Sequence, residues 1–333
     1  MINKLSLIQL SQRLLKKLKR WSVFSLVLAL TLGALTVMGI YWSSEPEVLR
    51  VTDRTSKSSP GKATVAMLND VVDLLLKKPG GFLSNDIMPP GVLLDNMPSW
   101  EFGVLVQVRD LSKALRESFS RSQSQSNEDP DLALAEPRFN VDHKSWAVPW
   151  PEREYAEGQA FLKSYLLRLD SAPPAAAEFF ARADNLRYWL ATIETRLGSL
   201  SQRLSASVGH SRVDGLPDGK VGEDIMRTRR VNKTPWLIVD NVFYEARGTT
   251  WALLNFLQAV RVDFADILEK KGATASLEQI IYELEMSQTP LKTPVIVNGQ
   301  GFGLFANHSL VMASYISRAN AALIDLRDLL ARG

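Results

Sequence analysis

The clearest hydrophobic pattern in the chain is an uninterrupted apolar run near its N-terminus. No charged residue lies between Arg20 and Glu45, and residues 22–41 include ten Leu, Ile, Val or Phe side chains. A helix of that length spans about 30 Å, which matches the hydrocarbon core of a bilayer. At roughly −0.3 to −0.6 kcal/mol each, these side chains contribute about −3 to −6 kcal/mol to membrane insertion. The pattern predicts one transmembrane helix over 21–42.

The residues that flank this run predict its orientation. Residues 1–20 carry six basic side chains and no acidic one, so the positive-inside rule places this tail in the cytoplasm. Trp21 at one edge, and Tyr41 and Trp42 at the other, are typical of an aromatic belt. A cleaved secretory signal is the alternative, but the run is longer than the usual h-region and no small-x-small site follows it. We therefore expect an uncleaved, single-pass protein of the bacterial inner membrane, with its C-terminal body in the periplasm.

Three later segments repeat apolar residues at spacings that alternate between three and four. This a/d periodicity predicts long helices that pack at shallow angles along heptad seams. The positions are Phe179, Ala183, Leu186, Leu190, Ile193, Leu197, Leu200 and Leu204; then Phe243, Ala246, Thr250, Leu253, Leu257, Val260, Phe264 and Ile267; then Met312, Ile316, Ala319, Leu323, Leu326 and Leu330. We expect a mainly α fold, an elongated antiparallel helical bundle with little β-structure.

Shorter patterns fill the rest of the body. Apolar periodicity predicts four more helices, over 62–78, 101–120, 152–170 and 276–287. Ser276 and Gln279 have the spacing of a capping box and predict the start of the last of these. Residues 79–101 fit neither a helical nor a strand period, which predicts an ordered loop packed on the body.

Composition divides the chain into four parts. These are a basic cytoplasmic tail (1–20), the transmembrane helix (21–42), a Ser- and Pro-rich juxtamembrane linker (43–62) and a periplasmic helical domain (63–333). Within that domain, polar or Gly/Pro-rich stretches near 121–137 and 208–235 predict mobile connections. Residues 236–239 follow them as a short extended piece.

Charge and cysteine content exclude several functional classes. The formal net charge is +3, but the six basic residues of the tail account for it, and the remaining chain is slightly acidic. Such a body does not have the basic surface of a nucleic-acid-binding protein. The chain contains no cysteine, which excludes disulfides, thiolate catalysis and Cys-ligated metals.

A stripe of small residues lies on one face of the apolar run. Ser25, Ala29 and Gly33 have the small-xxx-small spacing that lets two transmembrane helices approach closely. The stripe predicts a possible homo-oligomer, with chance occurrence in a span tolerant of small residues as the alternative.

The densest group of polar and aromatic residues lies in the 85–101 loop. It comprises Asn85, Asp86, Asp95, Asn96, Trp100 and Glu101. Paired carboxylates beside an aromatic ring are typical of glycoside chemistry, which makes Asp86, Asp95 and Glu101 candidate catalytic residues. The same residue types also form Asx turns and helix caps. Asn85, Asn96 and Trp100, together with Trp146 and Trp150, are candidates for a binding surface, with core packing as the alternative.

Other motifs indicate neither a metal nor a cofactor. His143, His210 and His308 lack metal-ligand spacing. Gly299, Gly301 and Gly303 follow a β-like run but form neither G-x-G-x-x-G nor a P-loop, which favours a tight turn into a helix.

Three stretches resemble a known family. They are GGFLSNDIMPPGVLLDNMPSWEFGVLVQVRD at 80–110, WAVPWPEREY at 146–155 and RADNLRYWL at 182–190. With one transmembrane helix shortly before them, they are similar to the DUF2333 family of uncharacterised proteobacterial proteins, over nearly the whole chain. The resemblance implies a Gram-negative inner-membrane setting and brings no activity, ligand or catalytic residue with it.

These features predict a non-enzymatic, membrane-anchored periplasmic scaffold that binds an envelope protein partner. The alternative is a periplasmic enzyme that acts on cell-wall or polysaccharide substrates through the acidic residues of the 85–101 loop. A sensor that relays a signal through the membrane ranks last, because the short tail holds no output domain.

Overall fold

The computed structural model describes residues 4–49, 59–122, 127–171, 177–213, 229–291, 293, 295–299 and 304–332. Its α-helices are α1 (Lys4–Trp42), α2 (Lys62–Lys77), α3 (Asn96–Ala114), α4 (Pro130–Phe139), α5 (Pro151–Asp170), α6 (Ala183–Ser205), α7 (Val239–Asp263), α8 (Ala265–Lys270), α9 (Thr274–Ser287) and α10 (His308–Ala331). A π-helical turn, Leu115–Phe119, extends α3, and 3₁₀ turns cover Gly91–Leu93, Ala206–Val208 and Trp236–Ile238. Two short strands, β1 (His210–Val213) and β2 (Arg229–Asn232), pair antiparallel.

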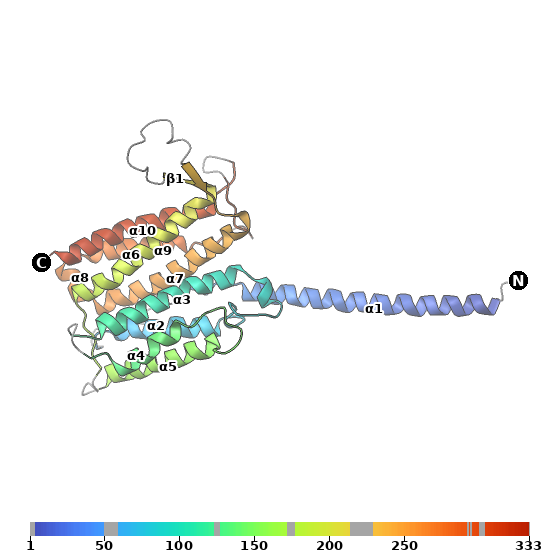
Figure 1. Ribbon diagram of the computed structural model, residues 1–333, viewed down its shortest axis with the longest axis horizontal. Coiled ribbons are helices and arrows are strands. Elements are labelled where there is room, and N and C mark those ends of the chain that lie inside the picture. The colour runs from blue at the N-terminus through green and yellow to red at the C-terminus, as the bar shows by residue number, and fades with distance from the viewer. Residues whose placement is uncertain are drawn as a thin grey trace.

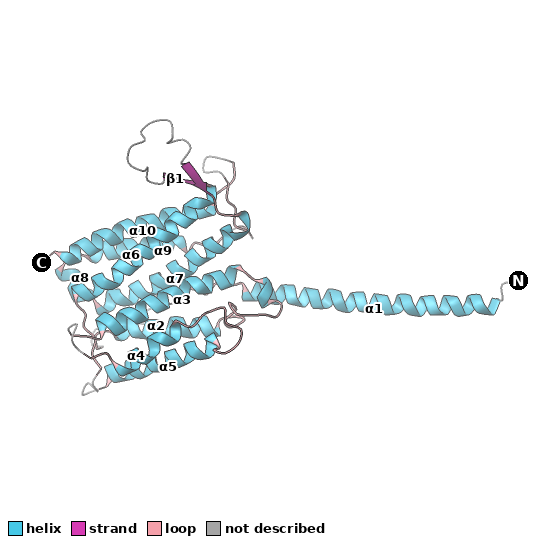
Figure 2. Cartoon of the chain, viewed as in Figure 1, coloured by secondary structure: helices cyan, strands magenta, loops and turns pink. Residues whose placement is uncertain are grey.

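The helix α1 projects from one end of a helical body (Figure 1). The long body helices lie beside one another, so that their connections gather at two opposite ends. We call the end from which α1 projects the near end; its described loops include 78–95, 140–150, 233–238 and 304–307. The opposite end, the far end, includes 264–273. Helices make up nearly all of the ribbon in Figure 2, which confirms the predicted mainly α fold.

The N-terminal part of the structure matches the predicted apolar span. Among the described residues, Trp21–Trp42 is the one helical stretch long and apolar enough to cross a membrane, with a mean hydropathy of 2.3. The helix itself begins earlier, at Lys4, and therefore continues through the basic tail.

The periodic positions of two predicted seams lie in the core. In α6 the positions from Leu186 to Leu204 are buried, and in α10 so are those from Met312 to Leu330. The two helices touch through Ser201 and Ser317, whose hydroxyl oxygens are 2.6 Å apart. The heptad geometry and the antiparallel order of the bundle stay predictions.

The helix α7 is the central element of the body. Burial extends around its whole circumference, and includes polar side chains such as Arg247, Thr250 and Asn255 as well as the apolar ones. A helix that is covered on every side does not present a single heptad stripe. The predicted seam from Phe243 to Ile267 is also interrupted, because α7 ends at Asp263 and Phe264 lies between α7 and α8.

Two glycines allow α3 and α7 to cross at very short range. A Cβ atom on Gly103 would lie 2.1 Å from the carbonyl oxygen of Glu245, and one on Gly248 would lie 2.0 Å from that of Trp100. No side chain fits at either place, so the two backbones are in direct contact.

The predicted mobile connection at 121–137 is wrong for its second half, which forms α4. Asp129 caps this helix by accepting hydrogen bonds from the backbone N–H groups of Asp131 and Leu132, at 3.0 and 3.4 Å, and Pro130 occupies its first position. Leu132 and Phe139 then face the core. In the other predicted connection, 208–235, the ends form β1 and β2, and residues 214–228 lie outside the described part of the chain.

Three local predictions are corrected by helix geometry. The helix predicted from 101 begins at Asn96, within the predicted loop. Residues 236–238 form a 3₁₀ turn into α7 instead of an extended piece. The capping box at Ser276 is wrong, because α9 begins two residues earlier, at Thr274, and has no side-chain cap.

Candidate functional site

The loop before α3 is built around a buried ion pair. Lys78 Nζ lies 2.6 Å from Oε1 of Glu101, and both side chains are almost fully buried. Glu101 also accepts hydrogen bonds from the backbone N–H groups of Leu83 and Ser84 and from the Ser84 hydroxyl, at 2.6–2.8 Å. Burial raises the pKa of Glu101, and the Lys78 ammonium acts in the opposite direction. Glu101 therefore holds the loop in place and does not face a cleft, contrary to the candidate catalytic role.

The same loop contacts the end of α1. Gly39 is buried, and a Cβ atom there would lie 3.7 Å from Pro90 and 3.8 Å from Leu94. One on Gly80 would lie 2.8 Å from the Trp42 ring, and Gly80 has a φ of +85°, which an L side chain rarely adopts. The last turn of α1 thus packs against the 80–94 loop on one side, while Ile40 and Tyr41 stay exposed.

Residues 43–49, which we call the attachment segment, continue this contact onto α7. Arg247 Nη2 lies 2.6 Å from Oε2 of Glu45, and Arg247 Nε lies 2.9 Å from Oε1. The Trp251 indole N–H donates to the Glu47 carbonyl at 3.3 Å, and Asn255 Oδ1 accepts from the Leu49 N–H at 2.8 Å. Residues 43–49 of the predicted juxtamembrane linker are therefore bound to the central helix.

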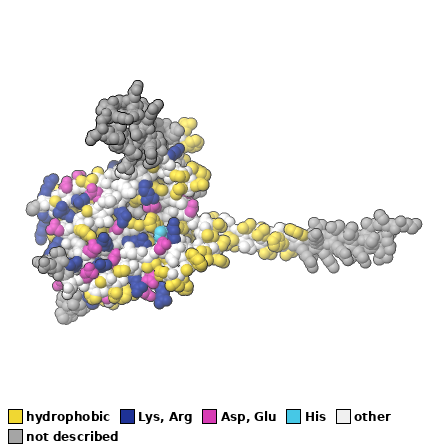
Figure 3. All heavy atoms as spheres, viewed as in Figure 1, with side chains coloured by type: hydrophobic (Ala, Val, Ile, Leu, Met, Phe, Trp, Pro, Cys, Tyr) yellow, Lys and Arg dark blue, Asp and Glu magenta, His cyan; other side chains and the backbone are white. Residues whose placement is uncertain are grey.

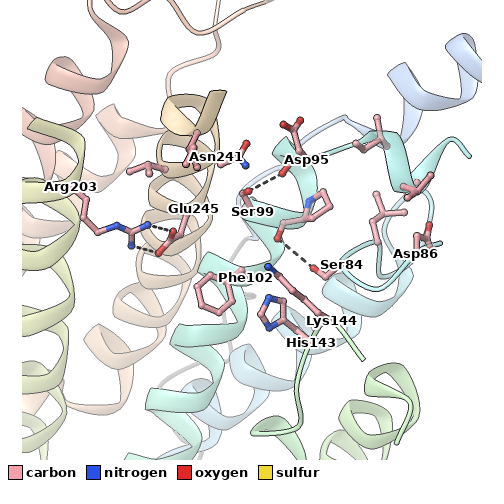
Figure 4. A pocket seen from close by; sticks show the side chains of 17 residues that line it. Ser84, Asp86, Asp95, Ser99, Phe102, His143, Lys144, Arg203, Asn241 and Glu245 are labelled. Carbon is pink, nitrogen blue, oxygen red and sulfur yellow. Dashed lines mark hydrogen bonds and ion pairs between the residues drawn. The ribbon is translucent and has the colours of Figure 1, made fainter. Parts of the chain in front are cut away.

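A cleft of about 450 Å³, which we call the first cleft, lies at the near end between the loop before α3 and the start of α7 (Figure 4). Its walls come from four places in the sequence: the 83–95 loop, α3, the His143–Lys144 turn and the start of α7, with Arg203 of α6 also lining it. The loop before α3 and the start of α7 lie close together because α3 and α7 cross at short range. The end of α1 packs beside the same loop.

The first cleft contains two of the three candidate carboxylates. Asp95 is exposed at the N-cap of α3 without a side-chain capping bond. Asp86 is packed on Gly91, and burial, followed by the neighbouring Glu152 carboxylate, raises the pKa of Asp86. The two side chains do not point toward one another (Figure 4). The geometry does not form the pair of facing carboxylates that glycoside hydrolysis uses.

Sequence reasoning missed the main charged pair of the first cleft. The Arg203 guanidinium donates to both carboxylate oxygens of Glu245, at 2.6 Å for Nη1, and joins α6 to α7 (Figure 4). The two residues are 42 positions apart in the sequence and belong to different helices. No local motif distinguishes them from solvated surface charges.

His143 lies on the wall of the first cleft and stacks on Phe102. Their ring centroids are 4.7 Å apart, with an interplanar angle of 28°. Burial lowers the pKa of His143, and the positive charge of Arg109 lowers it further. Both effects favour the neutral imidazole.

The remaining surface candidates divide into two groups. Trp100 is fully buried and packs 5.1 Å from Trp251, so it belongs to the core. Asn96 opens α3 and is partly buried. Asn85 donates to the Ser145 carbonyl and to the Glu152 carboxylate at 3.1–3.2 Å, which joins its loop to the segment that carries Trp146 and Trp150. These two tryptophans are 68% and 57% exposed and are available for contact.

A second cleft of about 370 Å³ lies between α7, α9 and α10. Its walls are mainly apolar and include Phe243, Met286 and Met312, and Arg247 and His308 also line it. His308 Nδ1 accepts from the Val297 N–H at 3.1 Å, so this histidine, the first residue of α10, holds residue 297 beside the start of that helix. The cleft is close to the attachment segment because Arg247 touches both.

The structure describes no group of three or more metal-binding side chains within the part of the chain that it covers. His143 and His308 belong to separate clefts. Gly301 and Gly303 of the glycine-rich turn lie outside the described residues. In α1, the Ser25 hydroxyl donates to the Ser22 carbonyl at 3.0 Å, Ala29 is exposed, and a Cβ atom on Gly33 would meet nothing within 4 Å.

The fold and the site define a class: helical proteins whose single apolar N-terminal helix is fixed directly to the body. The family described as an uncharacterised protein conserved in bacteria (DUF2333) matches residues 15–333, and the chain belongs to it. No curated protein and no solved structure matches the chain.

Proposed function

We propose that this chain is a single-pass protein of the bacterial inner membrane, whose helical body acts in the periplasm as a scaffold for another envelope protein. The apolar span, the basic tail and the membership of a bacterial family support the setting. In this arrangement the body is an antiparallel bundle, and apolar packing along its heptad seams stabilises it. The clefts on its surface are then available to a partner.

The observation that carries the proposal is the fixed connection between α1 and α7. A tethered enzyme that searches for a diffusing or polymeric substrate gains reach from a flexible linker. Here the chain leaves α1 and is bound at once by Arg247, Trp251 and Asn255. Such a connection holds the body at one height and one orientation above the membrane, which is what a scaffold requires.

The first cleft is the surface that we assign to the partner. It combines exposed apolar groups such as Val92 and Ile238 with the charged groups Asp95 and Lys144. Protein interfaces combine an apolar centre with a polar rim in this way. Because the cleft is at the near end, it faces proteins that lie in or on the same membrane.

Photocrosslinking in intact cells tests this assignment. Asp95 and Lys144 are each replaced by benzoylphenylalanine in the full-length chain, and Glu269, an exposed residue at the far end, provides the matched control. We expect the first two positions to give the same defined adduct with one second protein after irradiation, and the control to give none. Recovery of uncrosslinked chain alone from all three positions would contradict a scaffold role for this cleft.

A further inference from the structure

The near end of the body carries an unusual group of exposed apolar side chains. We call it the apolar rim: Met88, Leu93, Val148, Trp236, Leu237 and Leu304, which are between 70% and 101% exposed. They come from four loops that are separated by long helices in the sequence. Figure 3 shows hydrophobic side chains gathered along the side of the body from which α1 leaves.

The far end differs in this respect. In its described loops, which are 59–61, 120–122, 127–129, 177–182 and 264–273, no large hydrophobic side chain is exposed. Single exposed apolar residues are normal on any protein surface, but they scatter over it. Their concentration in the loops of one end indicates a surface that contacts something apolar.

The position of α1 relative to the apolar rim identifies that contact. Pro90 and Leu94, in the loop that carries Met88 and Leu93, lie beside Gly39. Gly39 is three residues before Trp42, which corresponds to about 4.5 Å along the helix axis. The loop therefore lies alongside the last turn of the apolar span, at the depth of the bilayer interface if the span crosses a membrane.

The attachment segment fixes this relationship. Glu45 is held by Arg247, and Leu49 by Asn255, so the body does not swing away from the end of α1. Trp236 and Leu237 precede α7, the helix that carries both holding residues. The rim is thus positioned by the same contacts that connect α1 to the body.

We propose that the near end is a membrane-contacting face, and that the apolar rim lies in the interfacial layer of the leaflet from which α1 emerges. The inference rests on the proposed membrane anchorage. A lipid surface fits better than a protein groove, because the rim consists of the tips of four separate loops at the end from which α1 emerges. Tryptophan together with large aliphatic side chains is the composition expected at that depth.

Nitroxide labelling of the full-length protein tests the proposal, and the absence of native cysteine makes single-site labels simple. Leu93→Cys and Leu237→Cys report on the rim, Leu30→Cys on the middle of the span, and Lys270→Cys on the far end. Each labelled protein is reconstituted in nanodiscs of phosphatidylethanolamine and phosphatidylglycerol. Power saturation then compares collisions with oxygen, which concentrates in lipid, and with the water-soluble complex NiEDDA.

We expect both rim labels to collide more with oxygen than with NiEDDA, at a shallower depth than Leu30, and the Lys270 label to do the reverse. Rim labels as water-accessible as Lys270, with Leu30 still in lipid, would overturn this inference and leave the anchorage intact. Rim labels shielded from both reagents would also overturn it, because they would indicate a protein contact. A water-accessible Leu30 label would instead contradict the anchorage itself.

Discussion

Arg247 in the middle of the central helix holds Glu45, three residues after the end of α1, through both carboxylate oxygens. The arginine is 5% exposed and also donates to the carbonyl oxygens of Ser287 and Thr289, at 3.2 and 3.1 Å. One side chain thus connects the attachment segment, α7 and the end of α9. This residue joins the apolar helix to the body.

Replacing Glu45→Gln should weaken that connection strongly. The change leaves a buried guanidinium without its counter-charge, and removal of one partner of a buried ion pair costs about 3 kcal/mol or more. Denaturant unfolding of the detergent-solubilised chain measures the loss of stability. Limited proteolysis should at the same time cut residues 43–49 faster, because the attachment segment loses its main contact.

Arg153→Gln provides the matched control. Arg153 and Glu157 form an ion pair at 3.1 Å on the outside of α5, where the arginine side chain is 75% exposed. Pairs of this kind contribute about 0.5 kcal/mol or less. If both substitutions changed stability equally, the importance given to the Arg247–Glu45 pair would be wrong.

Gly248→Ala should destabilise the body strongly, because Gly248 lies at the close crossing of α3 and α7. Its methyl group would lie 2.0 Å from the Trp100 carbonyl oxygen, and backbone cannot move aside as a flexible side chain can. We expect a loss of about 3 kcal/mol. Gly198→Ala in α6 is the control: its nearest neighbour would be 3.9 Å away, so it should leave stability unchanged or raise it by up to about 1 kcal/mol. Thermal unfolding of both variants checks the contrast.

Local signals in the sequence predicted the parts of the fold that local forces determine. Pro79 ends α2 and Pro151 starts α5, and both helices have the predicted bounds to within one residue. Proline fixes φ and lacks an N–H, so its effect on a helix needs no partner elsewhere. The apolar span is predictable for the same reason, since a continuous apolar run determines it.

The candidate site was less predictable because distant pairs form it. Glu101 has the appearance of an exposed carboxylate near a helix start, and only Lys78, 23 positions earlier in the sequence, makes it a buried structural group. Glu45 and Arg247 are 202 residues apart. Periodicity identifies which residues face a core, but it carries no information on which charge in one segment meets which charge in another.

The stability of the body should depend on the protonation of His143. Because burial and Arg109 lower the pKa of His143, the folded protein binds fewer protons there than the unfolded chain does just below the usual value of about 6.5. Stability therefore rises with pH through the window from the lowered pKa to about 6.5, and falls as the pH is reduced. Urea unfolding at pH 5.5 and 7.5 measures the difference, which should shrink in His143→Gln. An unchanged difference in the variant would show that other groups cause it.

Alkaline phosphatase fusions test the expected orientation. The enzyme folds only where disulfides form, so a fusion after residue 60, beyond the apolar span, should be active. A fusion after residue 20 keeps the basic tail and lacks the span, and it should be inactive. An inactive fusion after residue 60 would place the body in the cytoplasm and would contradict the proposed periplasmic setting.

Gly33→Leu tests whether the small-residue stripe of α1 brings two chains together. A Cβ atom at this position meets no other part of the chain within 4 Å, its own helix backbone aside, so the substitution should leave the fold of the monomer unchanged. If Ser25, Ala29 and Gly33 form a helix–helix contact, the leucine prevents close approach of the two backbones. Energy transfer between donor- and acceptor-labelled chains in nanodiscs should then fall several-fold.

Thr31→Leu is the control for this prediction. It adds bulk at an exposed position on roughly the opposite face and should have little effect, because residues two apart on a helix differ by about 200°. Equal energy transfer in the original chain and in Gly33→Leu would exclude the stripe as a dimer contact, and the span would then act as a monomeric anchor.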